Sequence, residues 1–238
     1  PIFVPNPTHR PVRRAHMSEN HALTAISAER GKGPELQAGA KPNVAPGRRR
    51  FCSQDEPLGR GHEVCGAREF VGGEPFAVIL PDDLIAAKPG CLAQMMDVWR
   101  NRGGNVVAVE DVDRAMTNRY GILDVLHDDG RIASAKGLVE KPAPSEAPST
   151  LSIIGRYILD GAVFDHLDKH ATGAGGEIQL TDAIAKTIDS VAFHGLRFDG
   201  KRFDCGSMSG FVEANVAFAL EQGQAANGLK ERLKRLLD

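Results

Sequence analysis

An apolar run without any charge occupies residues 76–80, with the sequence Phe-Ala-Val-Ile-Leu. Such a run indicates a strand that is buried on both faces. It ends at Pro81, and two adjacent acids, Asp82 and Asp83, follow. Open α/β sheets bind ligands outside the carboxyl ends of their strands, which makes this stretch a candidate site. Asp82 is a candidate ligand for a divalent cation, and the alternative is a strand-ending turn with a capping acid.

A helical pattern follows this strand at residues 91–102. Its apolar positions fall on one stripe: Leu92, Met95, Met96 and Trp99. The stripe predicts an amphipathic helix whose apolar side packs on the core rather than serving as a binding surface. The pair Gly103-Gly104 ends the helix, and residues 105–112 predict the next strand.

A β-hairpin is predicted around Asp128-Asp129-Gly130, between strands at residues 120–126 and 132–139. The second strand leads into Glu140-Lys141-Pro142. A charged pair at a strand end is often plain surface. Here the apolar residues before it favour a pair that projects from a sheet edge into a cleft.

Strands and helices continue to alternate in the C-terminal half. The predicted strands are residues 151–159, 191–198 and 201–203, and the predicted helices are residues 161–170, 177–188, 209–222 and 227–237. The strand at residues 201–203 runs into Asp204, a second acid at a strand end, and Gly206 follows shortly after. We expect Asp82 and Asp204 to lie close enough to share one cation. No internal repeat or linker is evident, so we expect a single domain over residues 1–238.

A turn-rich stretch with two glycines, residues 53–62, precedes a predicted helix at residues 63–70. Glycines such as Gly59 allow a backbone to approach a planar ligand, and the Gln54 amide offers both a donor and an acceptor. An ordinary loop is the alternative, because Gly-x-Gly alone is common.

The composition mainly excludes certain classes of function and location. The chain is 42% hydrophobic and 25% charged, as in ordinary globular proteins, and its net charge of −2 does not favour a nucleic-acid or membrane-surface partner. No apolar run approaches the length of a membrane span, and no signal peptide is visible. The four cysteines show no Cys-x-x-Cys spacing. We therefore expect neither zinc nor a disulfide framework, and a cytoplasmic location.

Several of these stretches together resemble the bacterial UTP–glucose-1-phosphate uridylyltransferases. The similar segments, in order, are QDEPLGRGH from Gln54, EPFAVILPDDLI from Glu74, Tyr120-Gly121-Ile122, GLVEKP from Gly137, Ala147-Pro148-Ser149, Gly155-Arg156-Tyr157, GGEIQLTDA from Gly175 and FDCGS from Phe203. They extend from about residue 51 to residue 220, and their combination is more specific than any one of them.

The resemblance implies an α/β fold with a Rossmann-like mixed, mostly parallel sheet flanked by helices. It also implies a nucleotidyltransferase that makes UDP-glucose and pyrophosphate from UTP and glucose 1-phosphate, with Mg²⁺ as cofactor. We expect a homo-oligomer without nucleic-acid or membrane partners.

The resemblance also implies roles for individual residues. Asp82 and Asp204 would hold Mg²⁺, and together with Lys141 they form the expected catalytic set. The expected substrate-binding residues are Gln54, Gly59, Asp83, Gly121 and Glu140. Gln54 and Gly59 would contact the uracil. Gly121, Glu140 and Lys141 would hold the glucosyl phosphate, with Glu140 on the sugar hydroxyls.

Two departures from the family pattern stand out. The family's N-terminal signature, a Gly-x-Gly-Thr-Arg loop followed by a Pro-Lys segment, does not occur within residues 1–238. Ser53, Arg60 and Glu63 also stand where the family usually has Arg, an apolar residue and Ala. We therefore expect residues 1–238 to form the larger, C-terminal part of such an enzyme, with little or no synthesis by themselves.

Two alternatives remain at the level of the sequence. A glycosyltransferase that uses a UDP-sugar would also place acids after a strand to hold a metal, although Glu140-Lys141-Pro142 and Asp204-Cys205-Gly206 argue against it. A degenerate homologue would bind a sugar nucleotide, or a partner subunit, without catalysis. The absent loop favours this reading, and the presence of both acids and Lys141 opposes it.

Overall fold

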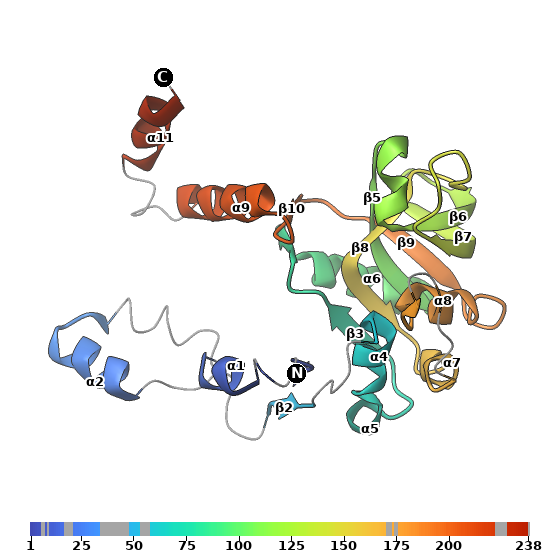
Figure 1. Cartoon of the computed structure of the whole chain (residues 1–238), viewed down its shortest axis with the longest axis horizontal. Coiled ribbons are helices and arrows are strands. Elements are labelled where there is room, and N and C mark those ends of the chain that lie inside the picture. Colours follow the sequence, from blue (N-terminus) through green and yellow to red (C-terminus); the bar gives the residue numbers. More distant parts are fainter. Residues whose placement is uncertain are drawn as a thin grey trace. The chain divides into compact units, whose positions relative to one another are not determined.

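The structure is a computed structural model that describes residues 1–5, 8, 10–16, 21–33, 48–52, 58–169, 173, 176–221 and 228–237 (Figure 1). The chain divides into two compact units. The first consists of Pro1–Gly72 with Phe164–Ala183, and the second of Gly73–Val163 with Ile184–Asp238. The expectation of a single domain stays a prediction.

The first unit contains short elements from both of its segments. They are β1 (Ile2–Phe3), α1 (Arg10–His16), α2 (His21–Glu29), β2 (Arg50–Phe51), α4 (Arg60–Cys65), α5 (Arg68–Val71) and most of α7 (Val163–Leu167). The helix predicted at residues 63–70 is thus two helices. β1 and β2 pair in parallel, and Arg68 ties α5 to the segment after residue 164 through ion pairs with Asp165 and Asp168.

The second unit is built on a six-stranded sheet with the order β3-β8-β5-β9-β7-β6. Its strands are β3 (Phe76–Ile79), β5 (Asn105–Asp111), β6 (Gly121–Asp128), β7 (Ile132–Glu140), β8 (Leu151–Leu159) and β9 (Phe193–Arg197). The α/β class, a central sheet flanked by helices, is confirmed. The expected strand directions are not: among these six strands only β5 and β9 pair in parallel. The predicted hairpin accounts for one antiparallel pair, and β8 runs antiparallel to both of its main neighbours.

The prediction that residues 76–80 are buried on both faces is wrong. β3 lies at one end of the strand order and pairs with β8 alone among the described strands. Its residues alternate between half-buried and exposed, and Ile79 is 54% exposed. A strand at the end of a sheet has one neighbour to cover it, and an apolar run alone does not reveal that position.

The core lies between the sheet and α6 (Cys91–Arg102), which contacts β5 and β8. Met95 is fully buried there in a cluster with Val98, Val106 and Ile158, while the remaining members of the predicted stripe are partly buried against it. Those members are Leu92, Met96 and Trp99. The helix has the predicted bounds, because its stripe and the glycines after it are local signals.

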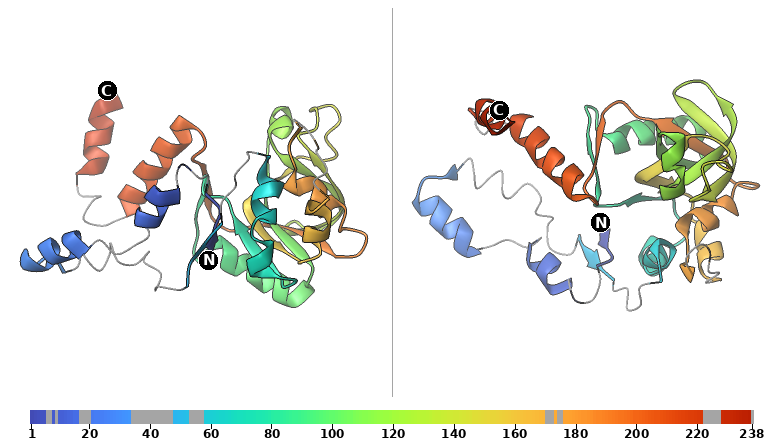
Figure 2. Two further views of the ribbon diagram at one scale, coloured as in Figure 1. Left: turned by 60° about the horizontal axis from the view of Figure 1, so that its bottom comes forward. Right: turned by 45° about the horizontal axis from the view of Figure 1, so that its top comes forward.

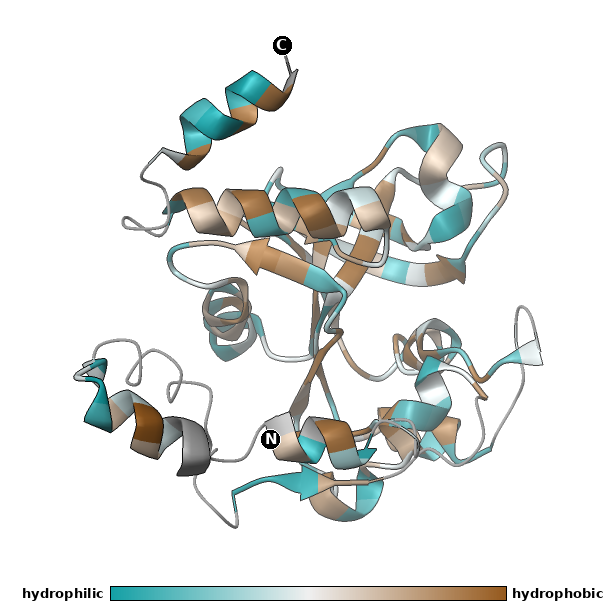
Figure 3. Ribbon diagram, turned by 60° about the vertical axis from the view of Figure 1, so that its left-hand side comes forward, coloured by the Kyte–Doolittle hydropathy of each residue, from teal (hydrophilic) through white to brown (hydrophobic). Residues whose placement is uncertain are grey.

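A smaller two-stranded sheet joins β4 (Asp83–Ala86) and β10 (Lys201–Asp204), which run antiparallel and lie side by side in Figure 2. α8 (Leu180–Ala185) precedes β9, and α9 (Met208–Glu221) and α11 (Leu229–Leu237) follow β10. Figure 3 shows hydrophobic residues along α9 and a larger share of hydrophilic residues along α11. Within the described parts of the chain, no helix combines the length and apolar character that crossing a membrane requires.

Candidate functional site

Asp82 and Asp204 come together through the pairing of β4 with β10. Asp82 lies in the turn between β3 and β4, and Asp204 is the last residue of β10. The antiparallel register places Asp204 opposite Asp83, next to Asp82 in the chain. The Cys205 amide also donates a hydrogen bond of 2.7 Å to the carbonyl oxygen of Asp82. The two acids are therefore neighbours, as the sequence led us to expect, although they come from distant parts of the chain.

The side chains of these acids converge on Gly206. A Cβ atom at Gly206 would lie 3.1 Å from Asp204 Oδ1 and 3.7 Å from Asp82 Oδ2. The Gly206 amide itself donates to Asp204 Oδ1 at 3.1 Å, and Arg119 Nη2 lies 3.7 Å from Asp204 Oδ2. The absence of a side chain at Gly206 thus leaves room beside two carboxylate oxygens.

The donor set at this point suits Mg²⁺. This cation prefers carboxylate oxygens, and proteins usually hold it through one or two carboxylates, with substrate phosphates and water as the other ligands. Among the described residues no group of three or more His, Cys, Asp or Glu side chains could hold a metal. A pair of carboxylates is the number of protein ligands that a Mg²⁺ site of this kind needs.

Asp83 is placed differently from Asp82. It is 9% exposed, and its carboxylate accepts a hydrogen bond of 2.9 Å from the Gly155 amide and pairs with Arg202 Nε. A Cβ atom at Gly155 would lie 2.7 Å from Asp83 Oδ2, so glycine is needed for this approach. The Asp83 carboxylate thus faces protein partners, and its expected contact with substrate stays a prediction.

Arg156 clamps the turn that carries Asp82. Its Nη1 donates to the Leu80 carbonyl at 2.8 Å, and its Nη2 donates to the Asp83 carbonyl at 2.5 Å. These carbonyls flank the turn on both sides. Burial lowers the pKa of the Arg156 guanidinium, although the nearby Asp83 and Asp82 carboxylates act in the opposite direction. The turn is therefore held to β8 by side-chain as well as backbone contacts.

The residues expected at the sugar phosphate are also neighbours. Gly121 at the start of β6 pairs with Glu140 at the end of β7, and Lys141 follows. Lys141 Nζ lies 3.6 Å from Glu140 Oε1. The Lys141 side chain is 49% exposed and that of Glu140 only 10%. Lys141 adopts a left-handed conformation with φ of 49°, and its amide donates to the Tyr120 carbonyl at 2.9 Å. Such a backbone costs a non-glycine residue about 1–3 kcal/mol and is often found at functional sites.

Sequence reasoning assigned no role to Arg202, Tyr120 or Arg156. Arg202 contacts Asp83, Glu110 and the ring of Tyr120. A signal for Arg202 was available, since residues two apart on a strand face the same side and Arg202 precedes Asp204 by that interval. Tyr120 and Arg156 lie within segments that carry the family resemblance. Only the folded chain shows what they touch.

The two expected uracil contacts are Gln54 and Gly59. Gln54 lies outside the described residues. Gly59 belongs to the first unit and precedes α4 with φ of 97°. A Cβ atom there would lie 2.8 Å from Glu177 Cβ, while Leu58 and Gly61 exchange backbone hydrogen bonds with Ile178. Glycine is thus required at this position by its backbone and by its neighbour.

Comparisons with known proteins place the chain among its relatives. No protein-family profile matches it. It is 36% identical over 235 residues to the UTP–glucose-1-phosphate uridylyltransferase of Staphylococcus haemolyticus, covering 99% of this chain and 81% of that protein. It is 52% identical over 178 residues to the corresponding protein of Komagataeibacter xylinus, covering 75% of this chain and 63% of that relative.

Solved structures agree with these relatives. A UDP-glucose pyrophosphorylase from Acinetobacter baumannii matches with a TM-score of 0.85 and 30% identity, covering 99% of this chain and 82% of that one. A UDP-glucose pyrophosphorylase complexed with UDP-glucose matches with a TM-score of 0.79 and 28% identity, covering 93% and 81%. The relatives and their structures share one activity in their names, and the acid pair and the Glu140–Lys141 turn lie in segments that carry the resemblance. The chain belongs to the UTP–glucose-1-phosphate uridylyltransferases, a family of nucleotidyltransferases.

Proposed function

We propose that this protein makes UDP-glucose and pyrophosphate from UTP and glucose 1-phosphate. The observation that carries the proposal is the convergence of Asp82 and Asp204 beside Gly206 in a chain of this family. The names of the relatives, and the UDP-glucose complex of a structural neighbour, favour this reaction over sugar transfer to an acceptor.

In the proposed reaction, a phosphate oxygen of glucose 1-phosphate attacks the α-phosphorus of UTP. A new phosphorus–oxygen bond forms, and the bond to the β-phosphate breaks, so that pyrophosphate leaves. Several negative charges meet, which makes positioning and charge neutralisation the main catalytic tasks. No protein nucleophile is needed.

The chain's residues divide these tasks. Asp82 and Asp204 would hold Mg²⁺, which when bound supplies positive charge to the phosphates. Lys141 would place its ammonium on the sugar phosphate as a point charge rather than as a base. Glu140 would accept hydrogen bonds from sugar hydroxyls, with the Gly121 backbone beside it.

Other expected contacts complete the proposal. Gln54 and Gly59 would bind the uracil. Asp83 is expected among the substrate-binding residues, and its contacts with the Gly155 amide and Arg202 support a structural contribution as well.

Binding is the first test, because it does not require turnover. Isothermal titration of residues 1–238 with UDP-glucose should show binding that strengthens with Mg²⁺. In Asp82→Asn, UDP-glucose should still bind weakly, but its affinity should no longer increase with Mg²⁺. Asp97→Asn is the matched control, since this exposed carboxylate lies on α6, where it pairs with Arg100. Absence of UDP-glucose binding with and without Mg²⁺ would overturn the proposal.

Turnover is the second test. Pyrophosphate release from UTP and glucose 1-phosphate should be low for residues 1–238, because the backbone amides of the glycine-rich loop would otherwise stabilise the triphosphate. Adding the N-terminal segment of the Staphylococcus haemolyticus relative, fused or as a separate fragment, should raise the rate of pyrophosphate release. A chain that binds UDP-glucose and remains inactive with that segment would support the non-catalytic alternative. Strong release from residues 1–238 by themselves would show that the loop is dispensable.

We also infer a homo-oligomer and a cytoplasmic location. α9 exposes large apolar side chains at Met208, Phe211 and Val212. Exposed apolar patches often mark protein interfaces, which supports contact between copies. Sedimentation velocity should show a species larger than a monomer for the wild type and a monomer for Val212→Asp. A wild-type monomer at micromolar concentration would contradict the oligomer.

A further inference from the structure

Arg202 lies between the two groups of expected site residues. Its side chain is only 10% exposed. Nε pairs with Asp83 Oδ1, and Nη1 lies 3.4 Å from Glu110 Oε2. The guanidinium carbon lies 5.5 Å from the centre of the Tyr120 ring. The guanidinium therefore contacts two carboxylates and one aromatic ring at the same time.

On one side, Arg202 supports the turn that carries Asp82. Asp83, its carboxylate partner, directly follows Asp82 and also accepts from the Gly155 amide. Arg202 shares β10 with Asp204, two positions further on, so both side chains project from the same side of the strand. A displacement of Arg202 would thus act on both acids.

On the other side, Arg202 contacts Tyr120, which is hydrogen-bonded to the Glu140–Lys141 turn. The Tyr120 carbonyl accepts a hydrogen bond from the Lys141 amide, and Gly121 pairs with Glu140. The guanidinium carbon of a second arginine, Arg119, lies 5.9 Å from the centre of the Tyr120 ring, and Arg119 pairs with Asp204. Tyr120 thereby contacts two arginines. Arg202 is paired with Asp83, and Arg119 is paired with Asp204.

We propose that Arg202 is a positioning residue that holds the Asp82–Asp204 pair and the Glu140–Lys141 turn in one arrangement, with Asp83 and Tyr120 as its two contacts. The inference rests on the proposed function and gives Asp83 a positioning role in place of a substrate contact. Burial opposes the charge of Arg202, but the Asp83 carboxylate and the Tyr120 hydroxyl outweigh burial and raise its pKa. The guanidinium is thus charged throughout the pH range of an assay.

Arg202→Lys tests the proposal, because it keeps the charge and loses the planar fork. The readout is Mn²⁺ affinity at a saturating concentration of UDP-glucose, measured by the electron paramagnetic resonance of free Mn²⁺. Outer contacts of metal ligands typically change affinity about 10- to 100-fold, and a weakening in that range is expected. UDP-glucose affinity without metal should also fall, since the Lys141 turn loses support.

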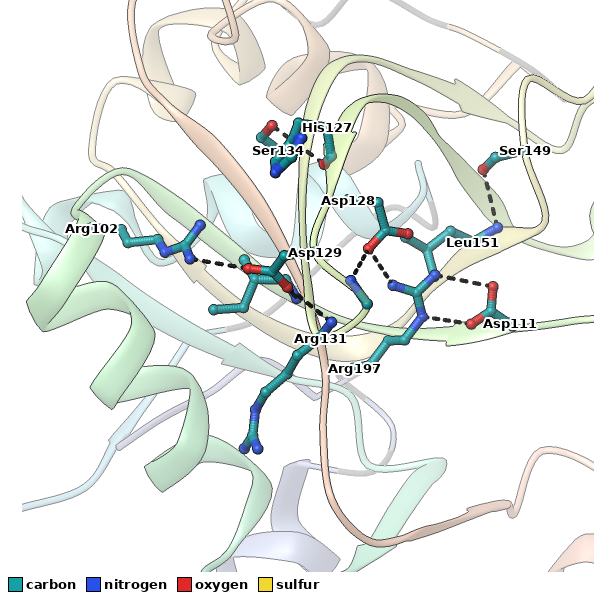
Figure 4. Close-up of polar contacts among 12 residues, drawn as sticks. Arg102, Asp111, His127, Asp128, Asp129, Arg131, Ser134, Ser149, Leu151 and Arg197 are labelled. Carbon is teal, nitrogen blue, oxygen red and sulfur yellow. Dashed lines mark hydrogen bonds and ion pairs between the residues drawn. The ribbon is translucent and has the colours of Figure 1, made fainter.

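Arg197→Lys is the matched control. Arg197 on β9 also pairs with two carboxylates, Asp111 at 2.6 Å and Asp128 at 2.9 Å, as Figure 4 shows. None of these residues belongs to the acid pair or to the Glu140–Lys141 turn. The control should lower the melting temperature and leave both affinities unchanged. Equal effects of the two variants on Mn²⁺ affinity would overturn the proposal.

Tyr120→Phe keeps the test informative if Arg202→Lys does not fold. It removes the hydroxyl that helps to raise the pKa of Arg202 and retains the ring that Arg202 contacts. Weaker binding of both Mn²⁺ and UDP-glucose, with folding intact, is the expected result. Unchanged affinities in Tyr120→Phe would overturn the link to the sugar side. If the wild type binds UDP-glucose with Mn²⁺ and the Arg202 and Tyr120 variants match it, only this inference fails. If the wild type binds neither, the proposed function fails with it.

Discussion

The Cys205 amide donates a hydrogen bond of 2.7 Å to the carbonyl oxygen of Asp82. This bond joins the loop after β10 to the turn before β4, and it involves neither carboxylate. The backbone therefore brings the acid-bearing segments together independently of side-chain charge. Substitutions of the acids can then be separated into effects on stability and effects on ligand binding.

Asp83→Asn should destabilise the protein far more than Asp82→Asn. The Asp83 carboxylate is buried with Arg202, and breaking a buried ion pair by removing one charge typically costs about 3–5 kcal/mol. Asp82→Asn keeps the carbonyl that accepts from Cys205 and should change stability by about 0.5 kcal/mol. Urea unfolding of both variants measures the difference. Equal free energies of unfolding would contradict the assignment of Asp83 to the buried pair.

Gly206→Ala should weaken metal binding without a large loss of stability. The added Cβ would lie 3.1 Å from Asp204 Oδ1, tighter than most such contacts, so the carboxylate must move. The Gly206 backbone lies outside the left-handed region, and alanine can adopt it. Mn²⁺ affinity with UDP-glucose should fall about 10-fold. Gly73→Ala is the control, because its Cβ would enter open space. Wild-type affinity in Gly206→Ala would exclude a metal beside this glycine.

Lys141 should show a conflict between stability and ligand binding. Lys141→Ala and Lys141→Gly both remove the ammonium and should weaken UDP-glucose binding equally. Only glycine relieves the left-handed backbone at φ of 49°, so Lys141→Gly should be more stable than Lys141→Ala by about 1 kcal/mol. Thermal unfolding and calorimetric titration of the two variants give both quantities. UDP-glucose binding at wild-type strength in both would remove Lys141 from the site.

His194 on β9 should make stability depend on pH. Neither of its ring nitrogens has a hydrogen-bond partner among the described residues. Burial, assisted by the charge of Arg102, lowers its pKa below the ordinary value of 6.5. The unfolded chain then binds a proton near pH 6.5 that the folded protein does not, so the free energy of unfolding decreases as pH falls from about 6.5 towards the lower, folded pKa.

Replacing the imidazole tests this dependence. His194→Leu should flatten the decline in unfolding free energy across that pH interval, and removal of an unsatisfied polar group should cost little. His127→Gln, at an exposed position of β6, is the control for replacing a histidine in the same sheet. A wild-type profile in His194→Leu would show that another group causes the decline.

The sequence by itself determined the elements whose signals are local. The apolar stripe and the glycines after it predicted α6 with its bounds, and Asp128-Asp129-Gly130 predicted the hairpin of β6 and β7. The hairpin in turn brings Gly121 opposite Glu140, because a turn sets the register of the strands that it connects. The family segments pointed to both acids in the same way, residue by residue.

Tertiary structure alone decided which distant segments meet. The apolar run at residues 76–80 could not reveal that β3 would end the sheet with Ile79 exposed, since exposure depends on which strands pair beside it. The contact of Arg202 with Asp83 likewise depends on the register between β10 and β4. The pattern of apolar and polar residues indicates only which positions of one segment are buried. Pairing between remote strands is settled by the free energy of the whole packed core, which no single stretch of sequence contains.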